Sequence, residues 1–275
     1  IESQRSTPRQ LWSSVDTLMG RGRVPTSAPI NADRMHQFFD DKVAGVRAST
    51  DSAPPPTYTI TPPDCRLSDF RRLTVDDVTA VVRALPDKQC ASDLLPTRLL
   101  KDHVDLLAPF LVELSNRSLF NGVVPDIFKA AYITLLLKKP DADPDDVKNY
   151  RPISNLTVLS KLLERLVAKQ QAARLPHNNS TATGPSVGLS SLPLDRDGCT
   201  EGPIGHSFDT VDHTILLHRL QTSYGLGSSV HDWFSSYLRD RTQYIRCGSK
   251  SRSAPTKVRF GVPKGSVLGP IFFLL

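Results

Sequence analysis

The sequence has little cysteine and no long hydrophobic run. Its four cysteines, Cys65, Cys90, Cys199 and Cys247, are scattered without a C-x-x-C spacing, which disfavours a zinc site and a disulfide framework. The longest apolar runs fall far short of the roughly 20 residues that a membrane-spanning helix needs. The 275 residues show no signal-peptide pattern either. We therefore expect an intracellular chain that has no membrane segment.

Acidic residues are in the minority. The sequence holds 28 Asp and Glu against 34 Lys and Arg, a net charge of +6. This surplus is compatible with a polyanionic partner, although many basic enzymes bind no nucleic acid. A chain of this length can bury a sizeable core, in one large domain or two small ones. Because it begins with Ile1 and ends in the apolar run 271–275, the sequence predicts a fragment whose apolar end is exposed.

The first 68 residues are predicted to be a largely irregular extension and a poor candidate for core. Prolines crowd "STDSAPPPTYTITPPDCR", a composition typical of linkers. The preceding "NADRMHQFFDDKVAGVR" is the exception, with Asn31 as a candidate N-cap. Its apolar residues fall at helical spacing: Met35, Phe38, Phe39, Val43 and Val46.

Residues 69–175 show the clearest helical patterns. In "LTVDDVTAVVRALPD", Thr74 and Asp77 form a capping-box pattern before an apolar face, and Pro86 ends the helix. The face consists of Val75, Val78, Val81, Val82 and Leu85. We expect "RLLKDHVDLLAPFLVELSNRSLFNG" to be helical, with a break near Pro109 and an end at Asn121-Gly122. The strongest helix is "NLTVLSKLLERLVAKQ", whose apolar residues lie at i, i+3, i+4, i+7 and i+8.

Strand patterns alternate with these helices. "AAYITLLLKKP" predicts a buried strand that ends in two lysines. "TQYIRCG" and "TKVRFGV" predict a hairpin across a polar turn at 249–253. Two more helices, "HTILLHRLQTSYG" and "SSVHDWFSSYLRDR", precede that hairpin. Helices mixed with strand pairs indicate an α+β fold.

A first candidate site lies in "LLLKKPDADPDDVKNYRPISNL". Lys138 and Lys139 end a predicted strand, and Arg151 follows an acidic loop in an extended segment before proline. Cations that a loop returns to a strand end suit phosphate, because guanidinium binds phosphate oxygens in pairs and ammonium acts as a point charge. The alternative is a solvated charged turn.

A second candidate site lies in "SFDTVDHTILLHRL". Asp209, Asp212 and His213 are residue types that bind metals. The spacing is equally compatible with a structural role, in which Asp212 caps a helix that begins at His213. In that case Asp209 favours the helix N-terminus by its charge.

The third stretch is "GVPKGSVLGP", which closely resembles the G-x-P-Q-G-S-x-L-G-P loop of reverse transcriptases from non-LTR (LINE-type, jockey-like) retrotransposons. Five other stretches resemble successive blocks of that family in the same order. They are "LPDKQCASDLLPTRLL", "FNGVVPDIFKAAYITLLLKKP", "KNYRPISNLTVLSKLLERLVAKQ", "FDTVDHTILLHRL" and "YGLGSSVHDWFSSYLRDRTQYIRCG". The resemblance covers roughly residues 68–175 and 207–275. A group II intron maturase is a lesser alternative.

The resemblance implies a right-hand polymerase fold, with fingers in 69–175 and a partial palm in 207–275. It implies an RNA template, a DNA primer and two Mg²⁺ ions that activate the primer oxygen and neutralise the leaving diphosphate. Nucleotide-binding residues would be Lys138, Lys139, Arg151 and Phe208, the last excluding a 2′-hydroxyl. The template and primer would lie against Gly261, Pro263, Lys264, Gly265 and Ser266, since glycines allow close backbone approach.

This sequence also departs from the family pattern. Pro203 stands where the family has its first metal-binding aspartate, and proline cannot bind magnesium. Residues 176–206 have no periodicity and predict an irregular, degenerate segment. Lys264 replaces the family glutamine, and the chain stops before a Y-x-D-D hairpin. We therefore expect no catalytic residues and no productive Mg²⁺ binding. Either the chain is an inactive polymerase fragment, or it is a non-catalytic relict that binds nucleic acid weakly and without sequence preference.

Overall fold

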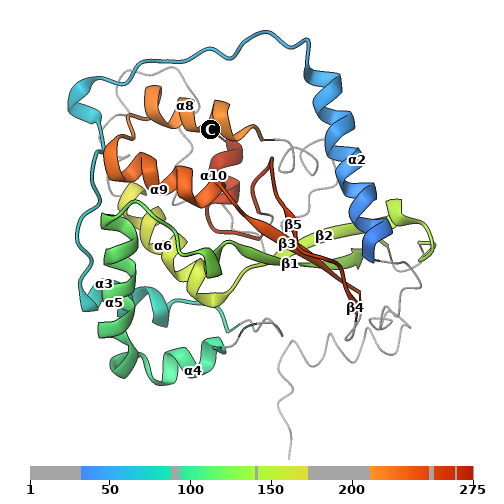
Figure 1. Ribbon diagram of the computed structural model, residues 1–275. Coiled ribbons are helices and arrows are strands. Elements are labelled where there is room, and N and C mark those ends of the chain that lie inside the picture. The colour runs from blue at the N-terminus through green and yellow to red at the C-terminus, as the bar shows by residue number, and fades with distance from the viewer. Residues whose placement is uncertain are drawn as a thin grey trace, which may run out of the picture.

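The computed structural model describes residues 32–87, 93, 95–139, 142–172, 211–247, 251–263 and 265–274 (Figure 1). Asn31, the predicted irregular segment 176–206, Phe208, Asp209 and Lys264 lie outside the described residues. The described part combines helices with one sheet, which confirms the α+β class. Within it, no helix is both long enough and apolar enough to cross a membrane.

The sheet has five strands, and its centre joins segments that are far apart in the sequence. Strand β1 (Ala130–Leu137) pairs antiparallel with β2 (Tyr150–Asn155) and parallel with β3 (Thr242–Cys247). Strands β4 (Ser251–Arg252) and β5 (Thr256–Lys257) both return antiparallel on β3. The predicted strand and hairpin are therefore confirmed, but β1 is buried on one face only and not on both. The returning strand is in two pieces, however, and the first begins inside the predicted turn.

The first turns of helix α2 (Ala32–Thr50) pack against one face of the sheet (Figure 1). Met35 is fully buried there, against a cluster to which Ile133 of β1 and Ile245 of β3 belong. In β1 the alternate residues Ile133 and Leu135 are buried, whereas Thr134 is exposed, as expected for a strand with one covered face. This part of the head of the chain, expected to be a poor candidate for core, thus supplies core side chains.

A larger core lies among the helices. It joins α3 (Val75–Arg83), α4 (Thr97–Asp102), α5 (Val104–Phe120), α6 (Val158–Ala172), α8 (His213–Thr222), α9 (Ser228–Leu238) and α10 (Gly269–Leu274). Short 3₁₀ turns occupy Pro63–Cys65, Asp126–Phe128 and Val147–Asn149. Four of the five residues predicted for the apolar face of α3 are buried, whereas Val75 is exposed.

Ile271 and Phe272 of the apolar run 271–275 are buried, so the expectation of exposure was wrong for these two residues. In α10, Phe272 is 2% exposed and packs edge-on against Phe234, with ring centroids 5.4 Å apart. Its ring also lies 5.9 Å from that of Tyr237. Aromatic side chains of α9 therefore provide the cover that the local sequence could not reveal.

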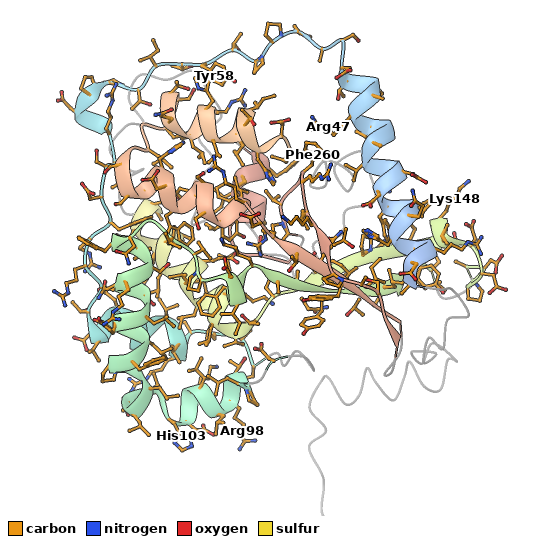
Figure 2. All side chains as sticks on the ribbon, in the orientation of Figure 1. Arg47, Tyr58, Arg98, His103, Lys148 and Phe260 are labelled. Atoms are coloured by element: carbon orange, nitrogen blue, oxygen red, sulfur yellow. The ribbon has the colours of Figure 1, made fainter. Side chains whose placement is uncertain are left out.

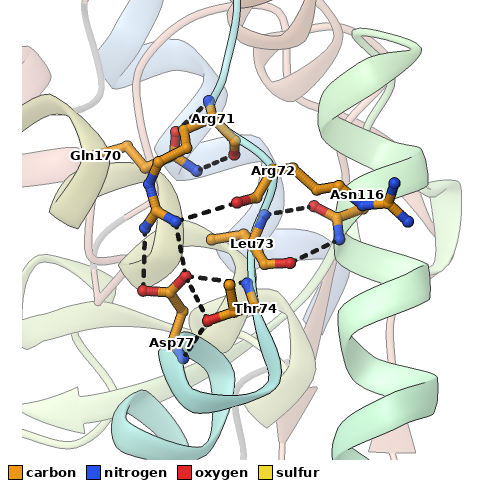
Figure 3. A network of polar contacts seen from close by, with 7 residues as sticks. All are labelled: Arg71, Arg72, Leu73, Thr74, Asp77, Asn116 and Gln170. Carbon is orange, nitrogen blue, oxygen red and sulfur yellow. Dashed lines mark hydrogen bonds and ion pairs between the residues drawn. The ribbon is translucent and has the colours of Figure 1, made fainter.

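The capping box of α3 is confirmed (Figure 3). Thr74 Oγ1 accepts a hydrogen bond from the backbone N–H of Asp77, and the Asp77 carboxylate accepts one from the N–H of Thr74. Arg71 donates two hydrogen bonds to the same carboxylate. Asn116 of α5 and Gln170 of α6 bond the backbone just before the helix. The start of α3 is thus fixed to two other helices.

The predicted break at Pro109 was wrong, because α5 runs through that residue. The interruption falls at His103, between α4 and α5, beside Arg98 in Figure 2. Pro109 removes one N–H donor to the carbonyl of Asp105, and Asp105 is exposed, so water can satisfy that carbonyl. The predicted end is confirmed, since Asn121 is the C-cap and Gly122 has φ +63°.

Candidate functional site

The "GVPKGSVLGP" loop begins against the start of α8. The backbone N–H of Gly261 donates to the carbonyl of Val211 at 2.8 Å. Nε2 of His213 lies 2.7 Å from the carbonyl oxygen of Gly261, which can only accept a hydrogen bond. Burial lowers the pKa of His213, so the ring is neutral at pH 7 and Nε2 carries the donated proton. Two of the blocks that carry the family resemblance are therefore bonded to each other.

Asp212 caps α8, which confirms the structural interpretation of this residue. Its Oδ1 accepts hydrogen bonds from the backbone N–H groups of Thr214 and Ile215. Its Oδ2 lies 3.1 Å from Nη2 of Arg47 on α2. Burial opposes ionisation, but the N–H of Ile215 and the Arg47 guanidinium outweigh it and lower the pKa of Asp212. Both oxygens are thus committed to protein donors.

Arg47 connects α2 to this region (Figure 2). Its guanidinium carbon lies 3.7 Å from the centre of the Phe260 ring, immediately before the loop, while the same group pairs with Asp212. One side chain from the head of the chain therefore contacts both the start of α8 and the start of the loop.

The glycines of the loop make room for other parts of the chain. Gly265 has φ +94°, and a Cβ there would lie 2.7 Å from the carbonyl oxygen of Ser154 in β2. A Cβ on Gly269 would lie 2.6 Å from Oγ of Ser266. The Ser266 side chain is buried, and its Oγ accepts the N–H of Gly269. Gly265 and Ser266, both predicted to contact template or primer, therefore already have close contacts within the chain.

A buried carboxylate holds the second half of the loop. Oε2 of Glu164 on α6 accepts hydrogen bonds from the N–H groups of Val267, at 2.6 Å, and Leu268, at 3.2 Å. Glu164 is 1% exposed, and burial raises its pKa while the nearby Arg241 opposes that rise. Arg241 is equally buried; it donates to the carbonyl of Tyr237 and lies over its ring.

Sequence reasoning missed Glu164 as a functional residue. The available signal was an acidic residue between Leu163 and Leu166, within a helix whose middle is buried nearly all round. A charge in such a position needs a partner, because burying it unpaired is costly. The sequence could show that need but not that the partners lie about a hundred residues further along.

The predicted phosphate-binding cations lie at one end of the β1–β2 pair. Arg151 is opposite Leu136, and the backbone N–H of Lys138 donates to the carbonyl of Asn149. Since side chains alternate along a strand, Lys138 and Arg151 belong to the same face of the sheet. Lys138 and Lys139 are exposed and Arg151 is partly buried.

We call this face the open sheet face. By register it carries Tyr132, Thr134, Leu136, Lys138, Arg151, Ile153, Asn155 and Tyr244. The Tyr132 and Tyr244 rings stack, with centroids 5.4 Å apart, and Asn155 donates to Oγ1 of Thr134. All eight side chains are exposed or partly exposed, and α2 packs on the opposite face. Cations and aromatic rings on one accessible surface suit a nucleic-acid strand.

The described residues bring no metal-binding group together. Among them, no three His, Cys, Asp or Glu side chains are placed to hold a metal ion. Asp212 and His213 are committed to a helix cap and to a loop carbonyl. Pro203 and Asp209, on which the metal prediction also depends, lie outside the described ranges.

Comparison with known proteins agrees with this arrangement. Residues 137–275, just over half of the chain, match the family model described as reverse transcriptase (RNA-dependent DNA polymerase). The chain is 28% identical over 221 residues to the RNA-directed DNA polymerase from mobile element jockey of Drosophila melanogaster, covering 73% of this chain and 24% of that protein.

Two further relatives extend the comparison. The chain is 29% identical over 231 residues to the probable RNA-directed DNA polymerase from transposon BS of Drosophila melanogaster, covering 74% of this chain and 24% of the relative. It is also 30% identical over 169 residues to the retrovirus-related Pol polyprotein from type-1 retrotransposable element R2 of Popillia japonica. That match covers 56% of this chain and 23% of the relative. The chain thus spans about a quarter of the length of these relatives. With more than half of its residues matched by the family model, the chain belongs to the reverse transcriptase (RNA-dependent DNA polymerase) family.

Proposed function

We propose that the chain supplies the fingers and part of the palm of a non-LTR retrotransposon reverse transcriptase, and that it binds nucleic acid through the open sheet face. One observation carries the proposal: three sequence-distant blocks are bonded into one unit. The N–H of Gly261 donates to the carbonyl of Val211, just before the N-cap of α8. Gly265 lies against Ser154 of β2, and Glu164 accepts the N–H of Val267. The loop is therefore fixed beside the strand that carries Arg151.

The charges on this unit suit phosphate groups. The planar guanidinium group of Arg151 suits a pair of hydrogen bonds to phosphate oxygens. The exposed Lys138 and Lys139 add positive charges at the same end of the β1–β2 pair. In an intact polymerase of this family these cations would neutralise the incoming triphosphate. Phe208 and Lys264 would complete the nucleotide and template contacts.

We further propose that this 275-residue chain does not polymerise. Reverse transcriptases generally use Mg²⁺, but Pro203 stands at the position of the first metal-binding aspartate, and the sequence contains no Y-x-D-D. Two of the described acidic residues, Asp212 and Glu164, are already bonded to backbone N–H groups, which supports the proposal. The alternative function is a non-catalytic nucleic-acid binder, which the same basic surface would support.

Salt-dependent binding tests the proposal. Binding of a labelled single-stranded RNA should weaken steeply with salt, and the double variant Lys138→Ala/Arg151→Ala, which removes both cations of the open sheet face, should flatten the slope of log K against log salt by about 1.4, at about 0.7 per lost phosphate contact. Fluorescence anisotropy across a salt series measures both slopes.

The matched control removes two positive charges elsewhere. Arg83→Ala/Arg98→Ala alters exposed arginines on α3 and α4, which pair at the surface with Asp105 and Asp102. This variant should keep the original slope while lowering affinity slightly at low salt. Equal salt slopes in the unaltered chain and in both double variants would contradict the proposed phosphate contacts.

A further inference from the structure

Helix α5 presents large apolar side chains to solvent along one face. Leu106 is 79% exposed, Phe110 64% and Phe120 84%. These residues, with Glu113 and Arg117, recur at intervals of three or four and so form one stripe. The helix lies at the outer edge of the molecule in Figure 1. Exposed aromatic residues gathered in this way are typical of an interaction surface.

The stripe is chemically symmetric about its middle. Glu113 and Arg117 lie two residues before and after Ser115, and they form an ion pair with 2.6 Å between Nε and Oε1. Phe110 and Phe120 lie five residues before and after the same point. The stripe therefore reads aromatic, acid, base, aromatic, with opposite charges at equivalent distances from the centre.

A second copy of α5, turned antiparallel about a two-fold axis at the level of Ser115, complements this stripe. Glu113 then lies at the level of Arg117 of the second copy, and Arg117 at the level of its Glu113. Phe110 lies at the level of Phe120 of the second copy. The same four residues of each copy would then form two ion pairs and two aromatic contacts. An isologous interface, in which both subunits use the same surface, has this arrangement.

We propose that this face of α5 is the seam of a two-fold symmetric dimer of the chain. A different partner would need complementary groups but would not need the stripe to be symmetric about its own middle. A single helix face buries less than the roughly 800 Å² per partner of a standard interface. The dimer is therefore weak, with a dissociation constant in the micromolar range or above.

Charge exchange across the seam gives the sharpest test. In Glu113→Arg each copy carries two arginines at the seam, and in Arg117→Glu each carries two glutamates, so like charges meet in either homodimer. Each variant alone should dimerise about tenfold or more weakly than the unaltered chain. An equimolar mixture of the two should form a heterodimer, because every charge then has an opposite partner.

Sedimentation velocity over a range of concentrations measures these equilibria, and circular dichroism verifies that each variant keeps its helix content. Arg98→Glu is the matched control, because Arg98 forms a similar exposed i,i+4 pair on α4. It should dimerise as the unaltered chain does. A chain that stays monomeric at the highest concentration would overturn the proposal and leave the face for another partner. Unchanged dimerisation in the charge variants, or a mixture that fails to associate, would overturn it as well.

Discussion

Glu164 connects two segments that lie about a hundred residues apart, through two hydrogen bonds that one of its carboxylate oxygens accepts. Removing the carboxylate would leave the N–H groups of Val267 and Leu268 without an acceptor in a buried place. It would also remove a carboxyl group that interacts electrostatically with the buried Arg241. The free energy of unfolding therefore depends on this residue far more than on a typical surface charge.

We expect Glu164→Ala to lower the free energy of unfolding by about 3 kcal/mol, because it leaves two N–H donors without their acceptor, and each buried donor left unpaired costs about 1–3 kcal/mol. Glu164→Gln keeps an acceptor and should cost less. Urea unfolding measures both changes. Lys169→Ala, an exposed change on the same helix, should alter stability by less than about 0.5 kcal/mol. If Glu164→Ala and Lys169→Ala lowered the free energy of unfolding by similar amounts, the stabilising role of Glu164 would be contradicted.

The same residue predicts a difference in pH dependence. Burial raises the pKa of Glu164 above its ordinary 4.5, so over the window above 4.5 the native state keeps a proton that the unfolded chain has released. Stability from this group therefore falls as the pH rises through the window. Glu164→Gln has no such proton, and its unfolding free energy should decline less as the pH rises above 4.5.

At the scale of elements, local patterns predicted much of the fold. The apolar period of α6, the capping box of α3 and the apolar run of β1 each specify their own element, because the signal and the structure involve neighbouring residues. The burial of α10 and the partners of Glu164 depend on segments distant in sequence. No local pattern could reveal them. The loop was found from the resemblance, whereas its anchors became visible only in the structure.

Helix α2 is the element whose role the sequence indicated least. Met35 is fully buried against the sheet, and Arg47 contacts Asp212 and Phe260. We expect Met35→Ala to lower the free energy of unfolding by about 2–4 kcal/mol, since it removes buried apolar volume. Ile60→Ala, at a side chain 80% exposed, serves as the control and should be nearly neutral. An equally small effect of both changes in chemical unfolding would show that α2 is a dispensable extension.

At the scale of the whole molecule, family membership together with our proposal that Pro203 replaces the first metal-binding aspartate predicts binding without synthesis. Given primed poly(rA), oligo(dT), dTTP and either Mg²⁺ or Mn²⁺, the chain should extend nothing above a protein-free blank. Positioning and charge neutralisation provide nearly all the rate of such transfers, so their loss is close to complete. Pro203→Asp alone should not restore activity, because the sequence has no Y-x-D-D. An active reverse transcriptase on the same primer provides the positive control, and extension by this chain would contradict the proposal.

The parallel pairing of β1 with β3 has a consequence for how the protein forms during synthesis. Ala130 is opposite Thr242, so the centre of the sheet cannot close until about 110 further residues have left the ribosome. Contacts of such long sequence separation slow folding. Their entropic cost, however, grows only with the logarithm of the intervening length, by about 0.6 kcal/mol for each doubling. Insertions and deletions in 176–206, where the sequence has least pattern, therefore cost the sheet little, and mutation can accumulate there while the surrounding fold persists.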